Sequence, residues 1–151
     1  MKFYIAIPVY KAEAFLSDCV SSVLNQTCQD FEIVLVDDGS PDGSGRLCDE
    51  FAARDGRIHA IHQKNTGPYG ARRTAIHFIL DHGSPEDRAV FLDADDSLKP
   101  EALETLADNL LNGRRESRDT VRDTLLHTVA CKAAIKAGWV NDEKELLAIA
   151  K

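Results

Sequence analysis

Short apolar runs alternate with amphipathic stretches from residue 1 to residue 99. Between residues 15 and 24 the apolar side chains recur three and four positions apart, which is typical of one face of a helix. The same spacing predicts helices over residues 47–52 and 75–80, the second of them ending at Gly83. Runs of apolar residues predict four strands, over residues 3–7, 31–36, 57–62 and 89–92, and the first of them is expected to stop at Pro8.

This alternation of strands and helices predicts an α/β fold of three layers with a parallel sheet in the middle. The run FEIVLV (31–36) shows no polar alternation, so we expect it to be buried on both faces of the sheet. The run RIHAIH (57–62) alternates and is expected nearer an edge. Ligands of such sheets bind beyond the carboxyl ends of the strands. Three of those ends carry distinctive sequences, which are PVYK, DDGS and DADD.

From Pro100 onward the pattern is helical only. Pro100 suits the first position of a helix, and Asn112 with Gly113 is expected to end it. A long helix is predicted from Ser117 to Gly138, and a last helix is predicted after it. The α/β region is therefore expected to be followed by an α-helical tail.

The composition excludes several classes of protein. Of 151 residues, 44% are hydrophobic and 28% are charged, which excludes a wholly disordered chain. The net charge of −7 disfavours nucleic acid and an anionic membrane surface as partners. No apolar run approaches the roughly 20 residues of a membrane span, and the N-terminus becomes polar too soon for a signal peptide. The four cysteines form no CxxC pair, so we expect reduced thiols in a cytoplasmic protein, with peripheral attachment to the inner face of the membrane as an alternative.

The sequence DADD offers two carboxylates at the end of a predicted strand. Asp93 and Asp95 are two positions apart, so in an extended backbone their side chains point the same way. Carboxylate oxygens suit Mg²⁺ or Mn²⁺, and such an ion can neutralise a leaving diphosphate. The alternative is an acidic loop in which Asp96 or Ser97 caps the helix that follows.

Three further segments carry candidate binding residues. Asp37 and Asp38 end a buried strand, where an aspartate can accept a hydrogen bond from a uracil imide or from ribose hydroxyls, or can form an Asx-turn instead. Pro8 ends the first strand, and Tyr10 offers an aromatic face to a base, or is simply a packed aromatic. In QKNTGPYGARR, Arg72 could meet a phosphate.

These segments in this order, IPVYKAEAFLSDCVSSVLNQT, FEIVLVDDGSPDGSG, QKNTGPYGARRTAI and VFLDADD, closely resemble the nucleotide-binding half of the glycosyltransferase family 2 enzymes, which have the GT-A fold. The resemblance covers residue 3 to about residue 106. It implies a nucleoside-diphosphate sugar, UDP-linked in our expectation, a divalent metal (Mg²⁺ or Mn²⁺) at a DXD motif, and transfer of the sugar to a saccharide or lipid acceptor. It further implies that Pro8 and Tyr10 border the base, that Asp38 binds the uracil, that Asp93 holds the ribose, and that Asp95 binds the metal and diphosphate. Two small departures from the family are Lys11, where it often has Asn, and Arg73, where an Asn often follows the arginine.

The resemblance divides the chain into an incomplete GT-A-like region, residues 1–106, and a helical tail, residues 107–151. The tail resembles a fragment of the C-terminal domain of the mismatch-repair protein MutL through the segment ACKAAIKAG, in which Cys131 matches a cysteine near a metal site of that family. The companion motifs DQHAxxE and CPHGRP are missing, so no nuclease site can be assembled. The MutL resemblance implies self-association through the tail.

In the glycosyltransferase family the second half supplies the acceptor site, the catalytic base and often a Gln-x-x-Arg-Trp stretch, none of which we find in residues 107–151. The catalytic residues are therefore unassigned, and we expect little activity from this chain on its own. Two alternatives stay open, a catalytically inactive nucleotide-sugar-binding module and a protein–protein module that uses the tail. An acidic residue of the tail that reached the donor pocket would favour the enzyme, and the candidates are Glu116, Asp119 and Asp123.

Overall fold

The computed structural model describes residues 1–116, with side chains as far as residue 111. The chain divides into two compact units, Met1–Leu103 and Glu104–Lys151, and the first contains the whole sheet. Eight elements follow one another in that description. They are β1 (Phe3–Val9), α1 (Leu16–Leu24), β2 (Phe31–Asp37), α2 (Ser44–Arg54), β3 (Ile58–His62), α3 (Gly67–His82), β4 (Arg88–Phe91) and α4 (Ala102–Glu116). The two later helices predicted for the tail lie outside the described residues.

The four strands form one parallel sheet in the order β3-β2-β1-β4. The prediction for the second strand is confirmed, because β2 lies inside the sheet and every residue of it except Glu32 is buried. The prediction for the third is confirmed as well, because β3 is an edge strand. All four carboxyl ends therefore point to the same edge of the sheet, where a ligand site is expected.

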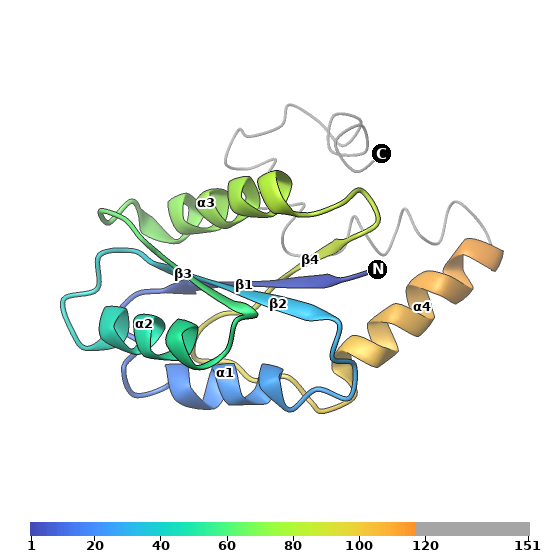
Figure 1. Ribbon diagram of the computed structural model, residues 1–151, viewed down its shortest axis with the longest axis horizontal. Helices are drawn as coiled ribbons and strands as arrows, with labels where there is room; N and C mark the ends of the chain where they lie inside the picture. The colour runs from blue at the N-terminus through green and yellow to red at the C-terminus, as the bar shows by residue number, and fades with distance from the viewer. Residues whose placement is uncertain (117–151) are drawn as a thin grey trace. The chain divides into compact units, whose positions relative to one another are not determined.

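Helices cover both faces of the sheet, which confirms the three-layer α/β architecture (Figure 1). On one face α3 packs on even-numbered strand residues, among them Tyr4, Ala6, Val34 and Val36, through Ala71 and Ala75. The odd-numbered residues of β1 and β2 are buried on the other face, where α1 and α2 lie (Figure 1). This strict parity means that two successive residues at a strand end leave the sheet toward different helical layers.

The first strand does not stop at Pro8 but continues to Val9, which corrects our expectation. The carbonyl of Ala6 accepts the N–H of Leu92 and so faces β4, whereas the carbonyl of Val9 accepts the N–H of Asp38 and faces β2. By alternation the nitrogen of Pro8 faces the β4 side, beyond Ala6, the last residue of β1 that β4 pairs with. No ladder hydrogen bond is lost there, so proline is tolerated in an interior strand.

Two helix boundaries also differ from the prediction. The helix expected from Pro100 to Asn112 begins at Ala102 and continues through Gly113 to Glu116. A glycine inside a helix costs only about 1 kcal/mol relative to alanine, so Gly113 alone does not have to end it. No helix within residues 1–116 is both long enough and apolar enough to cross a bilayer.

Candidate functional site

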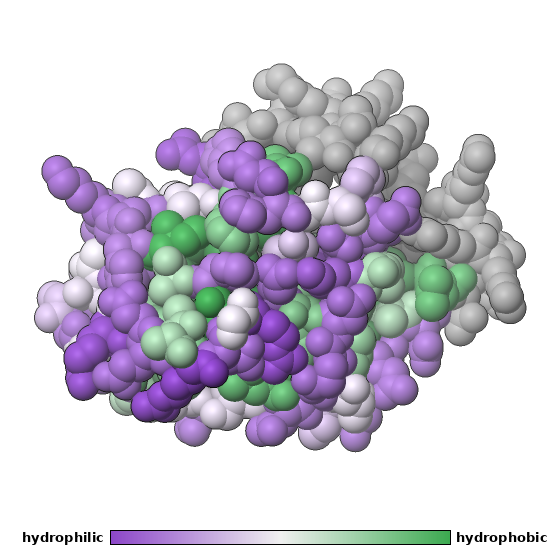
Figure 2. Space-filling view, viewed as in Figure 1, coloured by the Kyte–Doolittle hydropathy of each residue, from purple (hydrophilic) through white to green (hydrophobic). Residues whose placement is uncertain are grey.

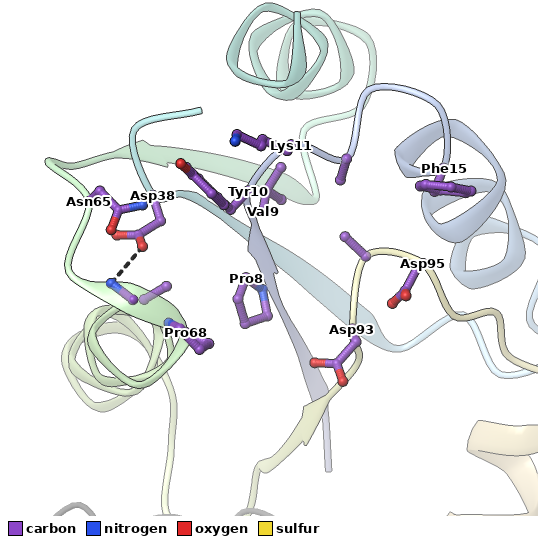
Figure 3. A pocket seen from close by; sticks show the side chains of 14 residues that line it. Pro8, Val9, Tyr10, Lys11, Phe15, Asp38, Asn65, Pro68, Asp93 and Asp95 are labelled. Carbon is purple, nitrogen blue, oxygen red and sulfur yellow. Dashed lines mark hydrogen bonds between the residues drawn. The ribbon is translucent and has the colours of Figure 1, made fainter. Parts of the chain in front are cut away.

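A cavity of about 450 Å³ opens beyond the carboxyl ends of the strands (Figure 3). Its lining comes from segments that follow β1, β2, β3 and β4. The lining residues are Pro8, Val9, Tyr10, Lys11, Ala12, Phe15, Asp38, Asn65, Gly67, Pro68, Ala71, Asp93, Ala94 and Asp95. Five of the residues that the sequence singled out are therefore brought together, and they are Pro8, Tyr10, Asp38, Asp93 and Asp95. Arg72 and Asp37 do not line the cavity.

The end of β1 supplies an aromatic ring to this cavity. Tyr10 remains 47% exposed, and the amine of Lys11 lies 5.4 Å from the centre of the Tyr10 ring. Lys11 has a φ of 51°, in the left-handed region that asparagine adopts more readily than lysine. This conformation accounts for the asparagine that the resembling family often has at the position. An accessible ring at the mouth of a cavity can stack on a planar ligand.

Asp38 is only 2% exposed, and its carboxylate organises the loop that begins α3. Oδ1 accepts hydrogen bonds from the side-chain amide of Gln63 at 2.7 Å, the N–H of Thr66 at 2.9 Å and the Thr66 hydroxyl at 3.3 Å. Oδ2 accepts from the N–H of Gly67 at 2.8 Å (Figure 3). Oδ2 accepts this single hydrogen bond, whereas Oδ1 accepts three, so Oδ2 has room for a further donor from a ligand in the cavity.

Asp37 lies on the opposite face of the sheet from Asp38. Its carboxylate accepts from the N–H of Ser40 at 3.0 Å and lies 3.0 Å from Nδ1 of His62, whose Nε2 lies 2.7 Å from Asp49. Burial raises the pKa of Asp37, but the hydrogen bonds from His62 and Ser40 outweigh it and the pKa falls below its ordinary value. Asp37 therefore holds the turn after β2, in the Asx-type arrangement that was the alternative to ligand binding.

The acidic segment after β4 forms a tight turn rather than the extended backbone we expected. The N–H of Asp96 donates to the carbonyl of Asp93 at 3.0 Å, so Asp93 and Asp95 are not related by strand alternation. Nη2 of Arg72 donates to the carboxylate of Asp93 at 2.6 Å, which ties the turn to α3. Within residues 1–111 the carboxylate of Asp95 has neither a hydrogen bond nor an ion pair, and it lines the cavity.

Cys19 lies beneath this turn. Its thiol, 1% exposed, is 3.6 Å from the carbonyl oxygen of Asp93. Burial, together with the negative charges of Asp96, Asp95 and Asp93, raises the pKa of Cys19 to about 12. The thiol is therefore protonated at neutral pH and is neither a nucleophile nor a ready metal ligand.

The donor set at the turn fits a hard divalent cation held jointly with a ligand. Among the described residues no group of three or more His, Cys, Asp or Glu side chains could enclose a metal by itself. Mg²⁺ is commonly bound by one or two carboxylates together with substrate phosphates rather than by an all-protein cage. Asp95, with Asp93 two residues before it at the cavity, meets that requirement.

Several lining residues were not foreseen as parts of a site, among them Phe15, Asn65 and Pro68. Phe15 was assigned to the buried face of the first helix, but it precedes α1 and is exposed at the cavity. No signal in the sequence marked Phe15, because adjacent residues of a helix can both be buried, as Cys19 and Val20 of α1 are. Asn65 lies in the loop before α3, and Pro68 lies in the first turn of that helix. Both precede the apolar pattern from which the helix was predicted, so that pattern did not indicate them.

A parallel sheet covered by helices on both faces, with an acidic and aromatic cavity beyond its strand ends, places the chain among the α/β proteins, in which ligands usually bind at that edge. The model of the family described as Glycosyl transferase family 2 matches residues 4–123. The chain belongs to this family. The match runs past residue 106, where we expected the tail to begin. The likeness of the tail to MutL finds no support in these comparisons.

Curated proteins similar to this chain include glycosyltransferases and a chondroitin synthase. The chain is 49% identical over 72 residues to the uncharacterized glycosyltransferase EpsJ of Bacillus subtilis, covering 48% of this chain and 21% of EpsJ. It is 38% identical over 105 residues to the glycosyltransferase GlyA of Streptococcus pneumoniae, covering 70% of this chain and 14% of GlyA. It is 38% identical over 104 residues to the chondroitin synthase of Escherichia coli, covering 69% of this chain and 14% of that protein.

Among solved structures, that of S. aureus TarS 1–349 in complex with UDP-GlcNAc has a TM-score of 0.63 and 24% identity, over 74% of this chain and 32% of TarS 1–349. The corresponding complex with UDP has a TM-score of 0.60 over the same share of this chain. At this identity the likeness establishes the fold, which is GT-A-like as expected. The chain spans well under half the length of each of these relatives.

The ion pairs of His62 make stability depend on pH. Hydrogen bonds to Asp37 and Asp49 raise the pKa of His62 above its ordinary value of 6.5. Below pH 6.5 His62 is charged in both the folded and the unfolded states, so the ion pairs contribute fully. This contribution is lost as the pH rises through the raised folded-state pKa. We expect the free energy of unfolding of the unaltered chain to fall over that window relative to His62→Gln.

The measurement is urea denaturation of both proteins at a series of pH values. The His62→Gln protein retains every other titrating group, so the difference between the two curves isolates His62. A difference that stays constant across the window would show that the two carboxylates do not stabilise a charged imidazole.

Proposed function

We propose that this chain is the donor-binding part of a glycosyltransferase that binds a UDP-linked sugar with Mg²⁺ or Mn²⁺ and takes part in transferring the sugar to a saccharide or lipid acceptor. The observation that supports this most directly is the single cavity that unites Tyr10, Asp38 and Asp95 from the ends of three strands. Family membership and the UDP and UDP-GlcNAc complexes of TarS point the same way.

The nucleoside lies at the Tyr10 and Asp38 side of the cavity. The exposed ring of Tyr10 stacks on the base, and Pro8 borders it. The free acceptor position on Oδ2 of Asp38 takes the imide N–H of uracil, a donor that cytosine does not present at that position. Because Asp38 is almost fully buried, this hydrogen bond forms away from competing water, which strengthens the discrimination.

The diphosphate lies at the turn Asp93–Asp96. Asp95, with a carboxylate free of protein partners among the described residues, holds the divalent cation, and Asp93 contacts the ribose or shares the cation. The bound cation would offset negative charge on the diphosphate as the sugar leaves. Arg72 acts on Asp93 through its 2.6 Å hydrogen bond and fixes the orientation of that carboxylate.

The catalytic base stays unassigned. In an inverting transfer the hydroxyl oxygen of the acceptor attacks the anomeric carbon, and a carboxylate takes the proton of that hydroxyl. The carboxylates that line the described cavity, Asp38, Asp93 and Asp95, all serve the donor in this proposal. The tail candidates Glu116, Asp119 and Asp123 lie outside the residues whose side chains the structure describes.

We expect Asp95→Asn to abolish the strengthening of UDP binding by Mn²⁺ and to leave metal-free UDP binding intact, because the Tyr10 and Asp38 side of the cavity is unchanged. Calorimetric titration with UDP, with Mn²⁺ and with chelator, measures both affinities. Thermal unfolding should hardly change, since the Asp95 carboxylate has no partner in the described protein to lose.

Asp96→Asn is the matched control, because it removes the same charge one position later from a side chain that does not line the cavity. Equal losses in Asp95→Asn and Asp96→Asn would indicate a general charge effect. Equal UDP affinity with and without Mn²⁺ in the unaltered chain would refute the metal assignment.

We expect Asp38→Asn to weaken UDP binding by about 1–3 kcal/mol, the usual cost of losing a buried hydrogen-bond acceptor, while binding of inorganic diphosphate with Mn²⁺ hardly changes. Thr66→Val serves as the control, because it removes the long hydroxyl contact to Asp38 but keeps the backbone N–H bond that holds the loop. If Thr66→Val weakens UDP as much as Asp38→Asn does, Asp38 acts only through the loop and not on the base.

A further inference from the structure

The side chain of Gln26, at the end of α1, is polar and yet only 2% exposed. Its amide nitrogen donates to the carbonyl of Ser22 at 3.0 Å and to the carbonyl of Lys99 at 2.7 Å. Its amide oxygen accepts the N–H of Leu103 at 3.0 Å. Both amide hydrogens are thus used, and the side chain joins α1 to the backbone of residues 99 and 103.

Neighbouring groups of α1 bind the same segment. The hydroxyl of Ser22 accepts the N–H of Leu98 at 3.0 Å, and the thiol of Cys19 lies 3.6 Å from the carbonyl of Asp93. The N–H of Thr27 donates to the carbonyl of Pro100 at 2.9 Å. Cys19 and Ser22 are three positions apart on α1, and Gln26 lies two residues beyond its last residue, so the three form one polar stripe that continues past the end of the helix.

The segment that this stripe holds has no regular structure of its own. Between the end of β4 at Phe91 and the start of α4 at Ala102 there is neither helix nor strand, and the acidic turn lies in this interval. In Figure 1 the segment runs alongside α1. Apart from the backbone hydrogen bonds of Leu92 with Ala6 and of Thr27 with Pro100, the segment is held by side chains of α1 and Gln26 and by Arg72 through Asp93.

From these contacts we infer that Gln26 and Ser22 are positioning residues for the divalent cation and diphosphate, because they anchor residues 98–103, the segment directly after the Asp93–Asp96 turn, against α1. This inference rests on the proposed function. Neither side chain lines the cavity, so both act on the turn only through the segment that follows it. The nucleoside side of the cavity, built on β1, β2 and the start of α3, does not depend on them.

The test separates the two sides of the cavity with two probes. Uridine has no phosphates and reports the Tyr10 and Asp38 side, whereas Mn²⁺ titrated into the UDP complex reports the turn. Direct hydrogen-bond partners of a metal ligand commonly contribute 10–100-fold in metal affinity. Gln26 acts one step further away, through residues 99 and 103, so we expect Gln26→Leu to weaken Mn²⁺ binding by roughly 10-fold, at the lower end of that range. Uridine affinity should stay unchanged. Ser22→Ala should act in the same direction to a smaller extent.

Gln29→Leu is the matched control. The amide of Gln29 also binds near the end of α1, but its partners are the carbonyls of Leu24 and Gln26 and the side chain of Arg57, not the segment before α4. This variant should retain the Mn²⁺ affinity of the unaltered chain.

Folded variants at Gln26 and Ser22 that bind Mn²⁺ as tightly as the unaltered chain would overturn the inference and leave the proposed function standing. Equal losses for uridine and for Mn²⁺ would overturn it too, because they would indicate a general structural role. If Gln26→Leu does not fold, Ser22→Ala decides. An unaltered chain whose UDP complex binds no Mn²⁺ would refute the metal assignment itself, and with it this inference.

Discussion

The parallel pairing of β1 with β2 is the constraint on which the nucleoside side of the cavity depends. The register places Val9 beside Asp37, and the N–H of Asp38 continues the ladder by donating to the carbonyl of Val9 at 2.9 Å. Tyr10 and Asp38 therefore leave the sheet from neighbouring positions and toward the same layer, where α3 begins. A shift of one residue would point Asp37 into the cavity and Asp38 toward α2, because side chains alternate between faces.

The acidic turn is governed by different forces. The last hydrogen bond to the sheet runs from the N–H of Leu92 to the carbonyl of Ala6, and beyond it side-chain hydrogen bonds contribute most of the contacts that hold the chain. The cavity thus combines one side that is as rigid as the central sheet with another held by a few buried polar contacts. Such contacts are costly to break singly, since each leaves an unpaired buried group.

On the face shown in Figure 2, hydrophilic residues surround small, separate apolar areas.

Much of the fold could be predicted because burial on both faces of a parallel sheet leaves a clear apolar run, as in β2. Proline at position 8 was misinterpreted because its tolerance depends on the length of a neighbouring strand, which no local pattern contains. Which of Asp37 and Asp38 faces the cavity could not be predicted. It depends on the face of the sheet to which each side chain points and on the position of His62, the partner of Asp37. Gln26 was not foreseen, because a polar residue just after an apolar helical stripe is usually solvated. Asp95 was expected at the end of the fourth strand and lies at the cavity there, but on a turn rather than on extended backbone.

The protonated thiol of Cys19 has a consequence for the kind of ion that the neighbouring turn can accept. A thiolate beside carboxylates would attract thiophilic ions such as Zn²⁺ or Cd²⁺. With a pKa of about 12 and a side chain closed off from solvent, Cys19 presents no such sulfur. The three carboxylates above it help to keep its proton in place. The ionisable side chains that the turn presents to the cavity, those of Asp93 and Asp95, therefore offer hard oxygen donors and no sulfur.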